Sequence, residues 1–312
     1  MNLLPVEPAC RLNARQPEER WLIESLWAHE AVGIVGGEPK CCKSYLALDM
    51  AVAVASGRPC LGRFPVRRSG RVLLFAAEDA LHEVRARLDG IARSRGIALE
   101  ELDVQVITAP TVRLDLAPDR ERLANTVGAL RPSLLVLDPF VRLHRIDENA
   151  SGEVAPLLAF LRELNRAHGL AVLLVHHAKK NGSKARAGQA LRGSSEFHAW
   201  GDSNLYLRRR GDALLLTVEH RAASGLTDIR LELGTDPAPA LRLAEDAPSP
   251  EPPVPDLRAR LLQTLGQAER PLRSVELRRA CRTRNQTLLE HLGQLVEEGL
   301  VAHDAGGYRL SS

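Results

Sequence analysis

The marks of a secreted or membrane protein are missing from this chain of 312 residues. Its five cysteines are odd in number and irregularly spaced, so they predict no disulfide framework and favour a reducing, cytoplasmic setting. No apolar run approaches the ~20 residues of a membrane span, and the first residues lack the charged and apolar regions of a secretory signal. Net charge is only +3, so any binding to nucleic acid must come from local patches.

Lysine is also scarce, because only five of the 42 basic residues are lysines. Lys40 and Lys43 lie in one short loop, and Lys179, Lys180 and Lys184 lie in another. A compact ammonium holds a phosphate as a point charge, and the planar fork of an arginine is not equivalent to it. These two loops are therefore the first candidates for phosphate recognition.

A proline-rich segment divides the chain. Residues 245–255 hold five prolines in eleven positions, which predicts an extended, semi-rigid linker. Residues 1–244 before it form the larger predicted domain, and residues 256–312 after it form a small one.

The larger domain has the pattern of an α/β fold. Apolar runs typical of buried strands alternate with helical periods, which predicts a mostly parallel sheet covered on both faces. Strands are expected at 31–35, 71–76, 104–108, 134–138 and 170–175, and helices at 43–56, 80–95 and 152–168. Shorter alternating runs predict an antiparallel extension at 204–207, 213–218 and 228–233.

The first lysine loop follows a predicted strand and opens a predicted helix, as a nucleotide phosphate-binding loop does. Backbone N–H groups there face the phosphates, Lys43 reaches the β and γ oxygens, and the Ser44 hydroxyl can ligate Mg²⁺. Cys42 replaces the second glycine of the G-x-x-x-x-G-K-S pattern, so its Cβ is expected to crowd the phosphate or slow turnover. The predicted ATP-binding residues are Gly37, Glu38, Pro39, Lys40, Cys41, Cys42, Lys43, Ser44 and Tyr45. A chance Lys-Ser pair in a strand–turn–helix is the alternative.

Carboxylates end two of the predicted strands. Asp138 is predicted to hold Mg²⁺ together with Ser44, and a solvated strand-end aspartate is the alternative. Glu78 and Asp79 follow the second strand, where a carboxylate can orient the attacking water. We favour Glu78 as the general base and Asp79 as a helix N-cap or an outer group.

His176 and His177 end the strand that follows Asp138. Adjacent residues on a strand point to opposite faces, so joint binding of a metal ion is not expected. A polar group at this tip, for which we take His177, can contact the γ-phosphate and report its hydrolysis. A purely structural histidine is the alternative.

The second lysine loop is basic and poor in apolar anchors over residues 178–192. Such charges suit sequence-independent contact with a phosphate backbone, so the loop is predicted to bind single-stranded DNA. The residues expected to make these contacts are Lys179, Lys180, Lys184, Arg186 and Arg192. A solvated surface loop is the alternative.

Together these motifs resemble the RecA-like ATPases, in the branch of plasmid RepA-type hexameric replicative helicases. The resemblance covers residues 20–235 and rests on four elements. They are Gly-Glu-Pro-Lys-x-x-Lys-Ser at 37–44, Ala-Glu-Asp at 77–79, Leu-Val-Leu-Asp-Pro at 135–139 and Val-His-His-Ala-Lys-Lys at 175–180. The resemblance implies a homo-oligomeric ring, a hexamer in this branch, with ATP at the subunit interfaces and DNA in the centre.

The same resemblance implies an arginine that reaches the γ-phosphate of a neighbouring subunit. Glu219-His220-Arg221 is similar to the Lys-x-Arg element of ring helicases, which makes Arg221 the first candidate and Arg208 the second. Such a guanidinium contributes about 10³–10⁵ in rate. Glu219 stands in place of the lysine. Together with Cys42, this departure leaves ATP binding more secure than fast hydrolysis.

The small domain is predicted to hold three helices, at 257–265, 274–281 and 285–298, and a hairpin at 300–310. Ser274 is the expected N-cap of the second helix. This order resembles a winged helix, whose third helix would enter the major groove of duplex DNA. The second helix and its flanks carry Arg273, Arg278, Arg279, Arg282 and Arg284. Nine arginines against seven acidic residues give the module a net charge of only +2, so a protein partner stays open as an alternative.

Two functions are compatible with these features. The first is an ATP-hydrolysing, oligomeric, cytoplasmic protein that acts on DNA as a helicase-like motor or loader of a plasmid or mobile element. The second is a nucleotide-switched scaffold with slow hydrolysis, which binds DNA or protein in the regulation of replication, recombination or transposition.

Overall fold

The computed structural model describes residues 4, 6–11, 17–177, 196–211, 213–235, 238–244, 257–268, 270–281, 283, 285–304 and 306–311. The chain divides into two compact units, residues 1–249 and 250–312. The boundary falls in the proline-rich segment 245–255, which lies outside the described residues.

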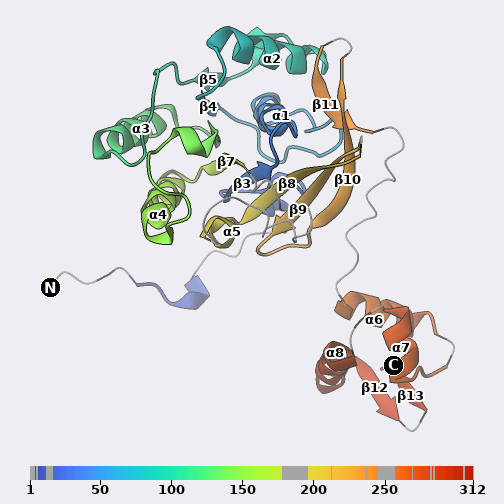
Figure 1. The fold of residues 1–312 in the computed structure, drawn as a ribbon. Helices are drawn as coiled ribbons and strands as arrows, with labels where there is room; N and C mark the ends of the chain where they lie inside the picture. Colours follow the sequence, from blue (N-terminus) through green and yellow to red (C-terminus); the bar gives the residue numbers. More distant parts are fainter. Residues whose placement is uncertain are drawn as a thin grey trace. The chain divides into compact units, whose positions relative to one another are not determined.

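A nine-stranded sheet forms the centre of the first unit (Figure 1). Its strands stand in the order β11-β10-β9-β8-β3-β7-β6-β4-β5. The bounds are β3 (Val32–Gly37), β4 (Val72–Ala76), β5 (Val104–Val106), β6 (Leu134–Asp138), β7 (Ala171–His177), β8 (Ser203–Arg210), β9 (Ala213–His220), β10 (Leu226–Gly234) and β11 (Ala240–Leu243). The pairs from β8 through β3 to β5 are parallel, and those from β8 to β11 are antiparallel. The predicted mostly parallel sheet with an antiparallel extension is confirmed.

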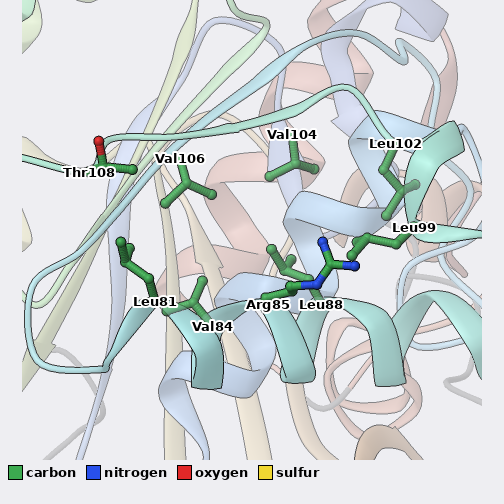
Figure 2. A pocket seen from close by; sticks show the side chains of 9 residues that line it. All are labelled: Leu81, Val84, Arg85, Leu88, Leu99, Leu102, Val104, Val106 and Thr108. Carbon is green, nitrogen blue, oxygen red and sulfur yellow. The ribbon is translucent and has the colours of Figure 1, made fainter.

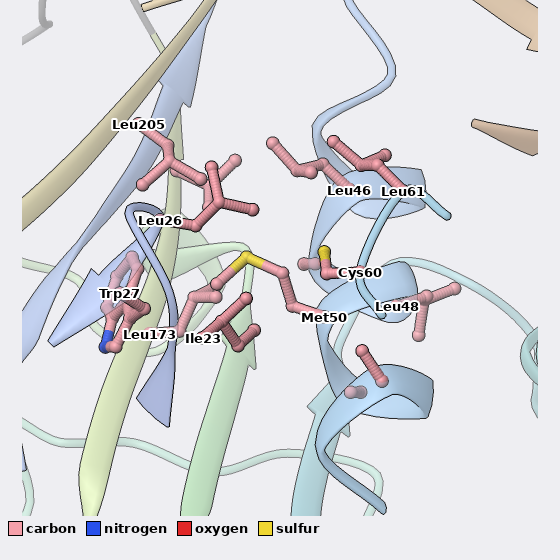
Figure 3. Close-up of a cluster of buried hydrophobic side chains, with 14 of the residues drawn as sticks. Ile23, Leu26, Trp27, Leu46, Leu48, Met50, Cys60, Leu61, Leu173 and Leu205 are labelled. Atoms are coloured by element: carbon pink, nitrogen blue, oxygen red, sulfur yellow. The ribbon is translucent and has the colours of Figure 1, made fainter. Parts of the chain in front are cut away.

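Helices cover both faces of the sheet. One face packs against α1 (Lys43–Ser56) and α2 (Leu81–Arg93), and the other against α3 (Ala117–Leu130) and α4 (Ser151–His168). Figure 3 shows the α1 side, where Met50 reaches from the helix toward Ile23 and Leu173. All three side chains are fully buried, and each such burial contributes about 1.5–3 kcal/mol to folding.

Short elements complete the first unit. They are β1 (Trp21–Ile23), β2 (Trp27–Ala28), α5 (Glu196–Trp200) and the 3-10 turns η1 (Ala9–Arg11), η2 (Pro17–Arg20), η3 (Leu99–Glu101) and η4 (Phe140–Arg142). None of the helices in the described part of the chain is long and apolar enough to cross a membrane.

Besides the short β1, β2 and α5, the elements α3 and β11 were absent from the sequence prediction. Helix α3 carries a weak signal, because only Leu123 and Val127 along its length are buried. Its start was nevertheless marked by Pro118, since proline is favoured in the first turn of a helix. Strand β11 is only four residues long and forms the outer strand of the extension, with Ala240 and Leu241 in the apolar cluster under α1.

The second unit contains three helices and a hairpin, namely α6 (Leu257–Gly266), α7 (Ser274–Ala280), α8 (Asn285–Glu297), β12 (Val301–Asp304) and β13 (Gly307–Leu310). Leu261, Leu277 and Leu292 are fully buried in its own small core. The prediction that Ser274 caps α7 is wrong, because Arg273 occupies the N-cap and its N–H donates to Glu276. Ser274 is instead the first residue of the helix.

Candidate nucleotide-binding site

The phosphate loop rises from the end of β3 and closes at the start of α1. Gly37 packs so tightly against β8 that a Cβ there would lie 2.4 Å from the carbonyl oxygen of Leu207, so only glycine fits. Cys42 occupies the N-cap of α1 with a left-handed φ of 58°, and its side chain makes no capping hydrogen bond. The first N–H groups of α1 therefore have no side-chain cap and face the loop, where an anion can satisfy them.

Lys43 is aimed across this loop. Its Nζ donates to the carbonyl oxygen of Glu38 at 2.7 Å, and the residue is only 5% exposed. Burial lowers the pKa of Lys43, while the nearby Cys41 thiol and Asp138 carboxylate act to raise it. A bound phosphate would supply the negative charge that this buried ammonium lacks.

Cys41 and Cys42 differ in their surroundings. The Cys41 side chain is buried in the apolar cluster beneath α1, and this burial raises the pKa of its thiol. Cys41 therefore packs as a small apolar residue, and it can offer a nucleotide only its backbone. Cys42 is half-buried and lies on the loop itself.

Asp138 at the end of β6 meets Ser44 at the start of α1. The Ser44 hydroxyl donates a hydrogen bond to the Asp138 carboxylate, which is 8% exposed. Burial raises the pKa of Asp138 to about 6, and the charges of Asp79 and Glu78 add to the rise, while Ser44 and Lys43 oppose it. A hydroxyl and a carboxylate held together are hard oxygen donors of the type Mg²⁺ prefers, so these two residues fit the predicted metal site.

Glu78 and Asp79 follow β4, which pairs with β6 so that Ala76 lies opposite Asp138. The Glu78 carboxylate accepts a hydrogen bond from Nε of Arg142 at 2.7 Å, and its side chain is 43% exposed. Asp79 pairs with Arg87 of α2, whose guanidinium lies 5.4 Å from the ring centre of Tyr45. The N-cap of α2 is Ala80, so the interpretation of Asp79 as a helix cap is wrong.

His176 and His177 lie at the end of β7, beside the first residue of the phosphate loop. The register pairs Gly37 with His177. His176 is buried on the α4 side and stacks on Phe197 with ring centres 4.3 Å apart. Because side chains alternate along a strand, His177 points to the α1 side, where the phosphate loop lies.

A half-buried carboxylate beside His176 escaped the sequence analysis. Glu148 Oε1 lies 3.3 Å from Nε2 of His144 and 4.0 Å from Nδ1 of His176. Burial acts to raise the pKa of Glu148, but the hydrogen bond with His144 and the charge of His176 give a net lowering. His144 and Glu148 lie four residues apart in the segment between η4 and α4, whereas His176 lies on β7. The distance in sequence between Glu148 and His176 carries no signal of their contact.

Of the two candidate arginine fingers, Arg221 lies away from the phosphate loop and Arg208 is held in an ion pair. Arg221 contacts Asp202 at 3.4 Å, and the backbone of Asp202 bonds to Val32, the first residue of β3. Arg221 is thus at the opposite end of β3 from the loop, roughly 16 Å away along the strand. Arg208 forms an ion pair with Asp228, and Glu219 lies 3.7 Å from His198. In one chain, the structure does not bring Arg221 to the nucleotide site.

Two further features are the predicted DNA-binding residues and a pocket. The predicted DNA-binding residues Lys179, Lys180, Lys184, Arg186 and Arg192 fall in residues 178–195, which lie outside the described residues. A pocket of about 280 Å³ lies between α2 and β5 (Figure 2). Its described lining is apolar apart from Arg85 and Thr108.

Comparisons with known proteins agree with this geometry. The family model described as "AAA domain" matches residues 2–183. Among solved structures, the crystal structure of the RadB recombinase superposes with a TM-score of 0.52 at 18% sequence identity. That match covers 70% of this chain and 92% of the other. At this level of identity the likeness shows the fold alone.

Proposed function

The chain belongs to the AAA domain family and has the RecA-like P-loop fold of a nucleotide-binding ATPase, and from this premise we propose that it is a Mg²⁺-dependent, DNA-acting oligomer. Within that class, we assign it the role of a helicase-like motor or loader of a plasmid or mobile element, working in the cytoplasm. The similarity to a recombinase fold supports a role on DNA.

The observation that carries the proposal is the convergence of Lys43, Ser44, Asp138 and Glu78 from three elements at one edge of the sheet. The loop N–H groups and Lys43 bind the phosphates. Ser44 and Asp138 would hold Mg²⁺, which when bound neutralises charge on the transferring phosphoryl group.

Hydrolysis also needs a positioned water. Glu78 is the proposed base that orients it and accepts its proton. To do so, Glu78 must exchange its hydrogen bond to Arg142 for one to the water. His177 lies beside Gly37 and on the loop side of the sheet, which supports its contact with the γ-phosphate.

The remaining groups belong to neighbours and partners. Arg221 is 54% exposed at the far end of β3, which supports a role on the nucleotide of an adjacent subunit. Residues 178–192 are proposed to hold single-stranded DNA in the centre of a ring, a hexamer by the family resemblance. The helix and hairpin order of the second unit supports a winged helix that binds duplex DNA or a protein.

A second candidate function is a nucleotide-switched scaffold with slow hydrolysis. The observation that favours it is the left-handed backbone of Cys42, which a side chain tolerates at a cost of about 1–2 kcal/mol. A loop strained in this way suits a protein that uses ATP to set its assembly more than to drive fast turnover.

The ATPase rate with and without single-stranded DNA separates the two functions. Strong stimulation by DNA that Lys43→Ala abolishes would support the motor. A low rate that DNA leaves unchanged, with assembly that depends on nucleotide, would support the scaffold. A protein that neither binds nor hydrolyses nucleotide would contradict both.

A further inference from the structure

Strand β8 runs past the end of its neighbour β3. The parallel pairing starts at Gly33 and Ser203 and ends at Gly37 and Leu207, but β8 continues to Arg210. Three arginines therefore extend beyond the point where β3 gives way to the phosphate loop. Their backbone stays paired with β9, so they stand on a regular strand beside the loop.

The alternation along β8 decides which of these arginines faces the loop. Leu205 and Leu207 belong to the apolar cluster under α1, whereas Tyr206 belongs to the cluster on the opposite face. Period two then places Arg209 on the α1 side and Arg210 on the other. The phosphate loop opens into α1, so Arg209 shares its side of the sheet.

Electrostatics agree with this placement. Burial raises the pKa of the Cys41 thiol, and the positive charge of Arg209 acts in the opposite direction, so the guanidinium lies within range of the loop. Arg208 is paired with Asp228. Among the described residues, Arg209 has no ion pair or side-chain hydrogen bond, and its side chain is exposed.

The strand order indicates whether Arg209 can contact the γ-phosphate or the nucleoside end of a bound nucleotide. Glu78 follows β4 and Asp138 ends β6. Both strands lie on one side of β3 in the sheet, and β8 lies on the other. A triphosphate with its γ-phosphate at those carboxylates extends its α-phosphate and nucleoside toward β8. A guanidinium can stack on a base or donate to phosphate and ribose oxygens there.

We propose that Arg209 binds the nucleoside monophosphate half of the nucleotide from the β8 side of the phosphate loop. This inference rests on the proposed nucleotide site and adds a residue to it. It makes Arg209 a binding residue for the part that ATP and ADP share, with no contact to the γ-phosphate.

The test compares Arg209→Ala with Arg210→Ala in the full chain, using the dissociation constants for ATP and ADP from direct titration. Both residues are exposed arginines at the end of β8, so Arg210→Ala controls for charge and for the strand. Arg209→Ala is expected to weaken ATP and ADP equally, by about tenfold, since a lost hydrogen bond to a charged group has that effect. Arg210→Ala is expected to change neither by more than about twofold.

Two results would overturn the inference. In the first, Arg209→Ala and Arg210→Ala bind ATP and ADP with equal affinity, while Lys43→Ala still abolishes binding. That result would reject the role of Arg209 and leave the proposed nucleotide site intact. The other is a loss for ATP alone, which would place Arg209 at a γ-phosphate. A wild-type protein that binds neither nucleotide would instead contradict the proposed function itself. Circular dichroism of both variants checks that the fold is retained.

Discussion

The residues proposed to bind the nucleotide and those proposed to hydrolyse it differ in burial and in their partners. The binding half, made of Lys43, Ser44 and Asp138, lies within one chain, and its two charged groups are 5% and 8% exposed. The proposed hydrolysis half is Glu78 together with Arg221 of a neighbouring subunit. These side chains are 43% and 54% exposed, and both are held in ion pairs. The first half is assembled by folding, while the second must break existing contacts before it can act.

This difference separates binding from turnover. Buried groups with fixed partners are preorganised, so nucleotide binding needs no rearrangement of the sheet. Exposed ion pairs contribute little to stability, so Arg142 and Asp202 can release Glu78 and Arg221 at small free-energy cost when a better partner arrives. In the proposed function, a neighbouring subunit or DNA would therefore control the rate of hydrolysis without altering the affinity for ATP.

Removing the proposed base should have the largest effect, because it should reduce hydrolysis and leave nucleotide binding unchanged. Glu78→Gln is expected to lower kcat by about 10²–10⁴, because a positioned acid–base group contributes that much. The affinity for ATP should stay within about twofold, since Glu78 belongs to the hydrolysis half. Single-turnover kinetics and equilibrium titration give the two numbers. If Glu78→Gln also lost affinity for ATP, binding and hydrolysis would not be separate functions of the two sets of residues.

Asp138→Asn tests the binding half through its electrostatics. The folded-state pKa is raised from 3.8 to about 6, so the carboxylate is less favourable in the folded protein, and stability falls as pH rises through about 4 to 6. At pH 7 this corresponds to roughly 3 kcal/mol of the free energy of unfolding. Asp138→Asn should thus stabilise the nucleotide-free protein at pH 7 and leave it nearly unchanged below pH 4.

Urea denaturation at pH 7 and below pH 4 measures the change in the stability of Asp138→Asn. The same variant should also lose the dependence of ATP binding on Mg²⁺. Ser44→Ala is the matched control, since it removes the hydroxyl that donates to Asp138 without removing the buried charge. That variant is expected to destabilise the protein at pH 7. A destabilised Asp138→Asn would show that the carboxylate is well accommodated in the nucleotide-free site.

Cys42→Gly should have the smallest effect of the three. Glycine adopts a left-handed φ without a Cβ penalty, so relief of strain is expected to stabilise the fold by about 1 kcal/mol, partly offset by the freer unfolded chain. If Cys42 also limits catalysis, turnover should rise several-fold at unchanged Mg²⁺ dependence. Thermal unfolding and steady-state ATPase rates check the two parts. If turnover stayed the same or fell, Cys42 would not limit the rate of hydrolysis.

The binding half was accessible from the sequence because its signals are local. Lys43 and Ser44 are adjacent, and Asp138 ends an apolar run that reads as a strand without any knowledge of its neighbours. Parallel strands bring their ends to one edge, so the meeting of these residues followed from the fold class.

The partners of the hydrolysis half were not accessible. The pairs of Glu78 with Arg142 and of Arg221 with Asp202 join residues from different elements in an arginine-rich chain. Nothing in the spacing selects these arginines from many others. The same holds for Glu148 beside His176, where loop geometry alone creates the contact.

Mixing two inactive variants tests most directly whether a neighbour completes the hydrolysis half. Lys43→Ala keeps Arg221 but lacks the binding lysine, and Arg221→Ala keeps the binding half but lacks the arginine. Each variant alone should have a small fraction of the wild-type ATPase rate. If Arg221 acts across a subunit interface, an equal mixture should regain roughly a quarter of that rate, since random assembly pairs a quarter of the interfaces correctly. A mixture no more active than the two variants measured separately would contradict the account.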